Sequence, residues 1–144
     1  MSRISIDEYY LNIAKAVSER STCLRRQYGA VLVNNDEIIS TGYNGSPRGA
    51  QNCCDVGICK RIEENSPHNS GDYSNCNSVH AEQNSFLSAS RAEMIGSTLY
   101  LAGFENGKSI DCEMCPICKR MAINAGVKRV VYSRKNGTFS ACTL

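Results

Sequence analysis

Two short segments of this chain carry histidine and cysteine at the spacing of a metal site. The first is residues 80–82 (HAE), and the second is residues 115–118 (CPIC). Zinc takes imidazole and thiolate ligands in tetrahedral geometry, and a catalytic zinc keeps three protein ligands and one position for water. A C-x-x-C at a helix start brings two sulfurs to one point. We therefore expect His80, Cys115 and Cys118 to hold a catalytic zinc ion, although Cys112 forms a second C-x-x-C with Cys115 and is an alternative ligand on spacing alone.

Glu82 follows the histidine by two residues, on the first turn of the same expected helix. From there its carboxylate can face the fourth zinc position without binding the metal, which is what a proton carrier requires. A C-x-x-C by itself is also typical of a redox pair or of half a structural zinc site, and an isolated H-A-E carries little information. Because both segments open helices, we expect a catalytic site with Glu82 as its acid and base.

The two segments match the zinc-deaminase pattern H-x-E…P-C-x-x-C. The sequence therefore resembles the cytidine deaminase superfamily and, within it, the deoxycytidylate (dCMP) deaminase family. Residues 21–26 (STCLRR), 42–49 (GYNGSPRG) and 80–84 (HAEQN) carry the resemblance, which spans residues 5–134. Met114 departs from the family, which usually has proline before the first cysteine of the pair.

The resemblance implies an enzyme that deaminates dCMP to dUMP by hydrolysis and so feeds thymidylate synthesis. The alternative is a related zinc deaminase that acts on another cytidine nucleoside or nucleotide, or on tRNA adenosine. A zinc-stabilised binding module without activity would keep the cysteines but would not need Glu82.

The resemblance also assigns contacts to the substrate. Asn44 is expected to bond the sugar hydroxyl, and the backbone N–H of Ala81 is expected to contact the base. Arg26 is a candidate cation for the 5′-phosphate, although a solvated pair of Arg25 and Arg26 fits the sequence equally well.

Many members of the family are regulated by dCTP and dTTP, and residues 42–49 resemble the part that holds the effector. Tyr43, Gly45 and Arg48 are the expected effector contacts, because backbone N–H groups of a glycine-rich loop and a nearby arginine suit a triphosphate.

Nine cysteines in 144 residues is an odd number, so they cannot all form internal disulfides. Clustered cysteines in a reducing compartment more often serve metal binding or catalysis. The resemblance implies a second, structural zinc held by Cys23, Cys53, Cys59 and Cys76. Cys54 and His68 are alternative ligands, although His68 lies in a polar stretch and is expected to be free. The remaining thiols, Cys54, Cys112 and Cys142, are expected to be ordinary.

The hydrophobic pattern predicts the elements that position these residues. Helices are expected at 5–20, 80–91 and 116–125, strands at 29–33, 37–41, 98–102 and 129–132, and a last extended piece at 137–141. The turn at 34–36 predicts a hairpin, and strand-helix-strand order predicts a parallel crossover beside it. Residues 50–79 show no periodicity. Together with the resemblance, this order predicts one domain, residues 1–144, with a three-layer α/β/α fold around a mixed five-stranded sheet.

Composition excludes several classes of protein. The net charge of +2 argues against a basic nucleic-acid groove, and 7% aromatic residues weaken the case for a base-stacking platform. No stretch reaches the length of a membrane helix, and the first eleven residues lack a signal-peptide pattern, so a cytoplasmic location is expected. The expected partner is a small nucleotide, and the resemblance implies a homo-oligomer, with a hexamer favoured.

Overall fold

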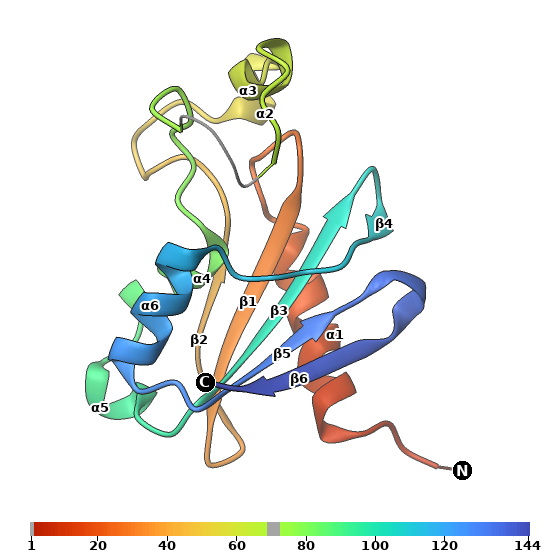
Figure 1. The fold of residues 1–144 in the computed structure, drawn as a ribbon, viewed down its shortest axis with the longest axis vertical. Coiled ribbons are helices and arrows are strands. Elements are labelled where there is room, and N and C mark those ends of the chain that lie inside the picture. Colours follow the sequence, from red (N-terminus) through yellow and green to blue (C-terminus); the bar gives the residue numbers. More distant parts are fainter. Residues whose placement is uncertain (1, 69–72) are drawn as a thin grey trace.

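The computed structural model describes residues 2–68 and 73–144, which form one sheet with helices on both faces (Figure 1). The strands are β1 (Gln27–Asn34), β2 (Glu37–Tyr43), β3 (Thr98–Glu105), β4 (Lys108–Ser109), β5 (Arg129–Ser133) and β6 (Phe139–Thr143). The helices are α1 (Ile6–Ser18), α2 (Cys53–Val56), α3 (Lys60–Glu63), α4 (Ala81–Leu87), α5 (Arg91–Met94) and α6 (Pro116–Ala125), with a 3₁₀ turn at Lys135–Gly137.

The strand order is β2-β1-β3-β5-β6, with β4 paired to the end of β3. Only the β3–β5 pair of the described sheet is parallel, and α6 makes the crossover between these two strands. The predicted mixed sheet and the predicted hairpin are thus confirmed. The expected five strands become six, because Asn106 and Gly107 adopt positive φ angles of 53° and 75° and fold β4 back on β3. An Asn-Gly pair is a strong local signal for a hairpin, which explains the additional strand.

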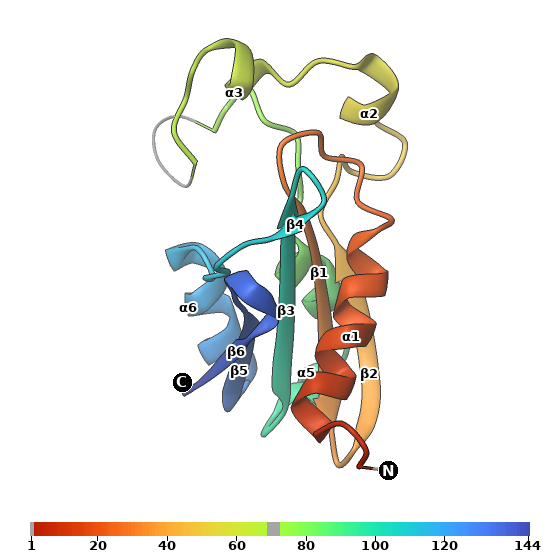
Figure 2. The same cartoon turned by 90° about the vertical axis from the view of Figure 1, so that its right-hand side faces the viewer.

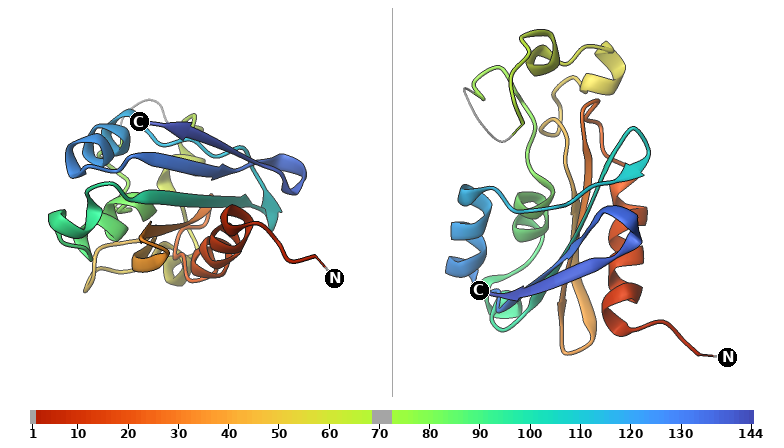
Figure 3. Two further views of the ribbon diagram at one scale, coloured as in Figure 1. Left: turned by 90° about the horizontal axis from the view of Figure 1, so that it is seen from below. Right: turned by 45° about the vertical axis from the view of Figure 1, so that its right-hand side comes forward.

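The sheet is covered on both faces, as Figures 2 and 3 show. Helix α1 lies on one face, while α4, α5 and α6 lie on the other. Alternate residues of β1 point to opposite faces, as the period of a strand requires. Ala30 and Leu32 belong to the core on the α4 and α6 side, and Val31 and Val33 belong to the core under α1. The three-layer arrangement is therefore the predicted one.

Helix boundaries follow local capping signals. Helix α6 has the predicted bounds, because Pro116 occupies its first turn and Gly126 ends it at φ 92°. The helix expected at 80–91 is instead divided into α4 and α5. Ser90 caps the new helix by accepting a hydrogen bond from the Glu93 backbone N–H at 3.2 Å. This capping box competes with continuation of α4.

The described residues of the 50–79 segment, 50–68 and 73–79, project beyond one end of the sheet, where α2 and α3 lie (Figure 1). The described part of this segment is tied to the sheet by backbone contacts. The Cys54 N–H donates to the Thr22 carbonyl at 3.0 Å, and Gly45 forms a β-bridge with Val79. Among the described residues, no helix is both long and apolar enough to cross a membrane.

Candidate active site

The two metal-ligand segments meet because α4 and α6 begin next to each other. His80 is the N-cap residue of α4, and its backbone N–H donates to the Gln83 side chain at 2.9 Å. Cys115 is the N-cap residue of α6, and its sulfur accepts a hydrogen bond from the Cys118 N–H at 3.4 Å. The two N-caps therefore present their side chains to the same point.

The position of α4 depends on close packing against β2. Gly42 of β2 lies against the backbone of Ala81 and Ser85, and a Cβ atom at this glycine would collide with both. The Ser40 hydroxyl donates to the Ser85 carbonyl at 2.7 Å. Helix and strand can approach this closely only because residue 42 has no side chain.

The three predicted donors fit a zinc ion. The His80 Nδ1 atom lies 3.5 Å from the Cys115 sulfur and 3.3 Å from the Cys118 sulfur. Zinc–nitrogen and zinc–sulfur bonds of about 2.0 and 2.3 Å at a tetrahedral angle would put nitrogen and sulfur about 3.5 Å apart. All three donor atoms lie within 4.8 Å of one another, and no carboxylate of the described residues belongs to this group.

Glu82 lies beside the donors without joining them. Its side chain contacts Cys118, and the residue is 5% exposed. Burial raises the pKa of the Glu82 carboxyl above its ordinary value, because the charged form loses its hydration. A carboxyl group with a raised pKa is suited to take up a proton and return it.

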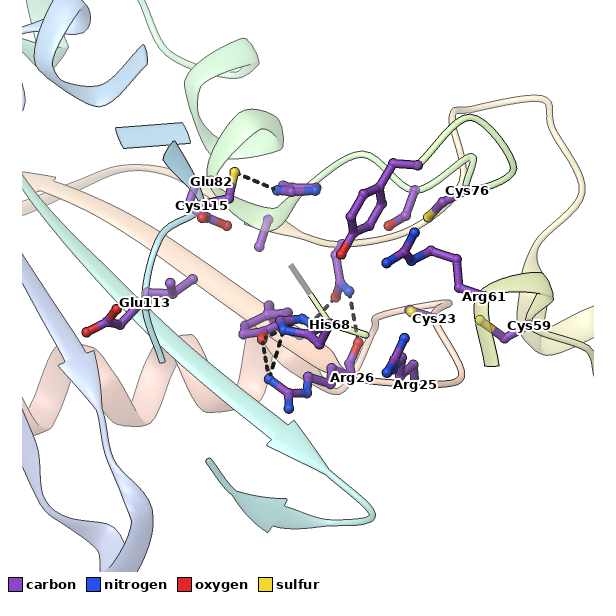
Figure 4. A pocket seen from close by; sticks show the side chains of 17 residues that line it. Cys23, Arg25, Arg26, Cys59, Arg61, His68, Cys76, Glu82, Glu113 and Cys115 are labelled. Atoms are coloured by element: carbon purple, nitrogen blue, oxygen red, sulfur yellow. Dashed lines mark hydrogen bonds between the residues drawn. The ribbon is translucent and has the colours of Figure 1, made fainter. Parts of the chain in front are cut away.

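A cavity runs from this centre to a cluster of basic side chains (Figure 4). His80, Ala81, Glu82 and Cys115 line one end, and Arg25, Arg26, Arg61 and His68 line the other. Arg61 and Tyr28 also line the cavity, and neither belongs to a motif that predicts a role in the site. Arg61 is only 3% exposed, although arginine is rarely buried, and Pro67 accepts its guanidinium hydrogen bond at 2.6 Å.

Asn44 and Ala81 line the cavity as expected from the sequence. The Asn44 side chain accepts hydrogen bonds from the Tyr28 N–H at 2.8 Å and the Ser21 hydroxyl at 2.6 Å, and donates to the Arg26 carbonyl at 2.9 Å. These contacts of the described residues use one of its two amide hydrogens, so the other can reach a ligand. Ala81 opens α4, where backbone N–H groups lack partners within the helix.

His68 belongs to no group of three metal donors in the described part of the chain, and it contacts two other residues that line the cavity. Its Nδ1 atom lies 3.1 Å from Arg26 Nη1, and its Nε2 atom lies 3.4 Å from the Tyr28 hydroxyl. Burial, followed by the charges of Arg26 and Arg25, lowers the pKa of His68 to about 4. No local sequence pattern pairs residues 26 and 68, so only the fold brings them together.

The four cysteines expected to hold a second zinc line a neighbouring cavity. Cys23, Cys53, Cys59 and Cys76 are all partly buried there, whereas Cys54 is exposed. Burial, followed by the nearby Cys23, Cys59 and Cys76, raises the pKa of the Cys53 thiol. In the described part of the chain, however, only the His80 group brings three such donors within 4.8 Å of one another.

The expected effector contacts and the remaining buried thiol lie outside the group of metal donors. Gly45 is buried and lines the cysteine cavity, while Tyr43 and Arg48 are exposed. Cys112 is fully buried, and its sulfur lies 3.3 Å from the Ser133 hydroxyl rather than among the metal donors.

The chain is similar to known deaminases in sequence. The family model described as "Cytidine and deoxycytidylate deaminase zinc-binding region" matches residues 4–134. The chain is 38% identical over 140 residues to a deoxycytidylate deaminase of Mycobacterium phage D29, covering 94% of this chain and 100% of the relative. It is also 38% identical over 133 residues to a deoxycytidylate deaminase of Schizosaccharomyces pombe, covering 90% of this chain and 37% of that relative.

Solved structures with the same arrangement include a dCMP deaminase from cyanophage S-TIM5 in complex with dCMP and dUMP. The match has a TM-score of 0.65 at 30% identity and covers 92% of this chain and 83% of that chain. A cytidine deaminase from Burkholderia pseudomallei, at 17% identity and a TM-score of 0.62, covers 97% of this chain and 93% of that chain and shares the fold.

Proposed function

The chain belongs to the cytidine and deoxycytidylate deaminase family, and from this we infer that it is a zinc-dependent enzyme that hydrolyses dCMP to dUMP and ammonia. The observation that carries the inference is the meeting of His80, Cys115 and Cys118 beside the buried Glu82 in one cavity. The relatives named above carry the same activity in their names, and the S-TIM5 structure contains dCMP and dUMP.

His80, Cys115 and Cys118 would hold the zinc ion. A zinc ion with three protein ligands supplies water whose pKa is lowered toward about 7, so that it can react at neutral pH. Both cysteines must lose their protons to bind the metal, which couples the affinity for zinc to pH.

Glu82 moves the protons of the reaction. It takes a proton from the water that attacks C4 of cytosine and delivers it to the ring nitrogen N3. The carboxylate then takes the proton of the new C4 hydroxyl and passes it to the departing amino group, so that the C4–N bond breaks, ammonia leaves and a carbonyl forms at C4. The Ala81 N–H and the remaining Asn44 amide hydrogen are the proposed contacts to the base and the sugar.

Only one orientation of dCMP in the cavity brings its amino group to Glu82. Its amino group must lie at the end that holds Glu82, so its 5′-phosphate extends toward the end that holds Arg26 (Figure 4). A phosphate monoester carries a charge of about −1.5 to −2 near neutral pH. We therefore propose Arg26 as the cation that binds it.

The decisive experiment compares four substrates by the loss of cytosine absorbance. With the zinc-loaded protein we expect dCMP to give the highest kcat/KM, ahead of CMP, deoxycytidine and dCTP. Deoxycytidine as the better substrate would contradict the role of the phosphate. Absence of turnover with all four would favour another zinc deaminase reaction, such as deamination of tRNA adenosine.

We also propose that Cys23, Cys53, Cys59 and Cys76 hold a second, structural zinc. Two observations support it. All four line one cavity, and burial, followed by the neighbouring cysteines, raises the pKa of the Cys53 thiol, so that a bound cation would be needed to stabilise its thiolate. Four thiolates make a closed tetrahedral site, and such a metal would stabilise a segment with little apolar core of its own.

The number of zinc ions per chain tests this second site. We expect the purified protein to contain about two, and a Cys59→Ser variant about one, with the catalytic zinc retained. Cys142→Ser, which removes an exposed thiol on β6, is the matched control and should keep the full amount. A wild-type content near one would contradict the second site, and Cys54→Ser tells whether Cys54 replaces one of the four.

Regulation and assembly stay predictions. Gly45 borders the cysteine cavity, so an effector that contacts Tyr43, Gly45 and Arg48 would bind next to the segment that contributes Arg61 and His68 to the active-site cavity. Effects of dCTP and dTTP on the dCMP assay, together with the mass of the protein in solution, test the effector site and the expected hexamer. The cytoplasmic location and the extent of the domain over residues 1–144 are likewise still predictions.

A further inference from the structure

The basic end of the cavity contains three arginines, and two of them are bound to the backbone. Arg25 Nη1 donates to the Ser66 carbonyl at 2.7 Å, and Arg61 Nη2 donates to the Pro67 carbonyl at 2.6 Å. Arg61 also stacks on the Tyr73 ring, with its guanidinium carbon 3.5 Å from the ring centroid. These contacts hold the backbone just before His68 against the cavity.

Arg26 differs from the other two because its partners are side chains. Its Nε atom is 3.5 Å from Glu105, and its Nη1 atom is 3.1 Å from His68 and 3.5 Å from the Tyr28 hydroxyl. Among the contacts of the described residues none uses the Nη2 group, so its two hydrogens can donate to a ligand. The orientation of the Arg26 guanidinium is therefore set by neighbouring side chains, whereas Arg25 and Arg61 are held by backbone carbonyls.

The short contact between Arg26 and His68 determines the state of the imidazole. A guanidinium has no acceptor, so Nδ1 of His68 must be the acceptor and the ring proton must lie on Nε2. The Nε2–H then faces the Tyr28 hydroxyl at 3.4 Å, and the two rings stack with centroids 6.3 Å apart. A neutral His68 adds no charge to the cavity, and what it supplies is an acceptor that orients Arg26.

We propose that His68 is a positioning residue for the nucleotide substrate, holding the Arg26 guanidinium in the direction in which its Nη2 group meets the 5′-phosphate. The proposal rests on the proposed function, because it assumes that dCMP is the substrate. It assigns part of the phosphate specificity to a residue of the 50–79 segment, 42 positions away from the arginine on which it acts.

The test separates substrate binding from catalysis. His68→Ala removes the acceptor, and we expect KM for dCMP to rise about tenfold with kcat little changed, since a hydrogen bond to a charged group is lost. The kcat/KM for deoxycytidine, which has no phosphate, should stay within twofold. His68→Asn is the matched control, because the Asn Oδ1 atom can take the place of Nδ1, and it should restore most of the affinity.

A double-mutant cycle tests whether His68 acts through Arg26. Arg26→Gln alone should raise KM for dCMP more than His68→Ala does, and the double variant should be no worse than Arg26→Gln. Additive effects would overturn the proposal, as would an unchanged KM in His68→Ala. Equal losses with dCMP and deoxycytidine would also overturn it, because they would indicate a structural role.

The wild-type protein separates this proposal from the proposed function. If it does not prefer dCMP over deoxycytidine, the proposed function fails before any His68 variant is compared. If it prefers dCMP and His68→Ala retains that preference, only the positioning role fails. Zinc content and unfolding temperature of each variant establish that it is folded and loaded, and the KM for dCMP decides wherever deoxycytidine turnover is too slow to measure.

Discussion

At the scale of single residues, the catalytic centre combines three donors that suit a cation with one carboxyl group that is kept from binding it. The donors are half-buried or buried at the starts of two helices, where His80 and Cys115 are the N-cap residues and Cys118 lies in the first turn of α6. Glu82 lines the same cavity. Burial raises the pKa of Glu82, and its position within the first turn of α4 keeps the side chain beside the three donors.

Glu82→Gln should therefore separate metal binding from proton transfer. The amide has the same shape as the carboxyl group but cannot carry a proton, so we expect normal zinc content and a fall in kcat of at least about 10²-fold. Metal analysis and the dCMP assay check both expectations. Glu113→Gln is the control, because it removes an exposed carboxylate of the same cavity and should have a much smaller effect. Turnover close to normal in Glu82→Gln would remove Glu82 from the mechanism.

At the scale of elements, the ligands converge because each helix is packed closely on the sheet. Gly42 of β2 allows α4 to approach, and Gly29 of β1 allows α1 to approach on the opposite face. Both glycines have helix backbone where a Cβ atom would be. The two positions therefore offer a matched pair for testing how the placement of α4 affects the site.

We expect Gly42→Ala and Gly29→Ala to lower the free energy of unfolding by similar amounts, about 1–3 kcal/mol, because both overpack a helix against a strand. Only Gly42→Ala displaces the helix that carries His80 and Glu82, so it should also lower the kcat of the folded protein roughly tenfold or more. Denaturant unfolding and the dCMP assay measure these effects. An equal loss of kcat in both variants, or none in Gly42→Ala, would contradict this role of α4.

At the scale of the whole molecule, an ion pair joins the first helix to the last part of the sheet. Arg129 of β5 donates to both carboxylate oxygens of Asp7 at 2.9 and 2.6 Å, and the Tyr100 hydroxyl donates to the same carboxylate at 2.8 Å. The Arg129 contact lowers the pKa of Asp7, with a smaller contribution from Tyr100. The partners are 122 positions apart, so the contact joins two segments near opposite ends of the sequence.

A lowered pKa in the folded state means that the Asp7 contribution to stability is present above the unfolded pKa of about 3.9 and is lost as the pH falls through the folded value. Asp7→Asn should therefore lower the free energy of unfolding at pH 7 by about 1 kcal/mol, a small value because Arg129 is partly exposed. The deficit should shrink in acid.

Urea unfolding at several pH values measures the Asp7 contribution. Glu8→Gln is the matched control, since Glu8 is an exposed carboxylate on the same helical turn. It should lose only the interaction with the helix dipole. A deficit for Asp7→Asn that does not depend on pH, or that equals the deficit of Glu8→Gln, would contradict the ion-pair explanation.

The sequence by itself determined the parts of this protein that depend on near neighbours. His80, Glu82, Cys115 and Cys118 could be identified because a helix start brings residues two or three positions apart to one point. The bounds of α6 followed from Pro116 and Gly126 for the same local reason. The division of α4 from α5 and the strand β4 also had local signals, at Ser90 and at Asn106-Gly107, which were not used.

Only the tertiary structure decided how the cavity is completed. His68 meets Arg26 from 42 positions away, and Asp7 meets Arg129 from 122 positions away. Such contacts depend on how the sheet and the 50–79 segment pack, because the entropy of closing a long loop is repaid only by the whole set of contacts. The local pattern therefore identifies the chemistry, while the packing of distant segments decides which side chains surround the substrate.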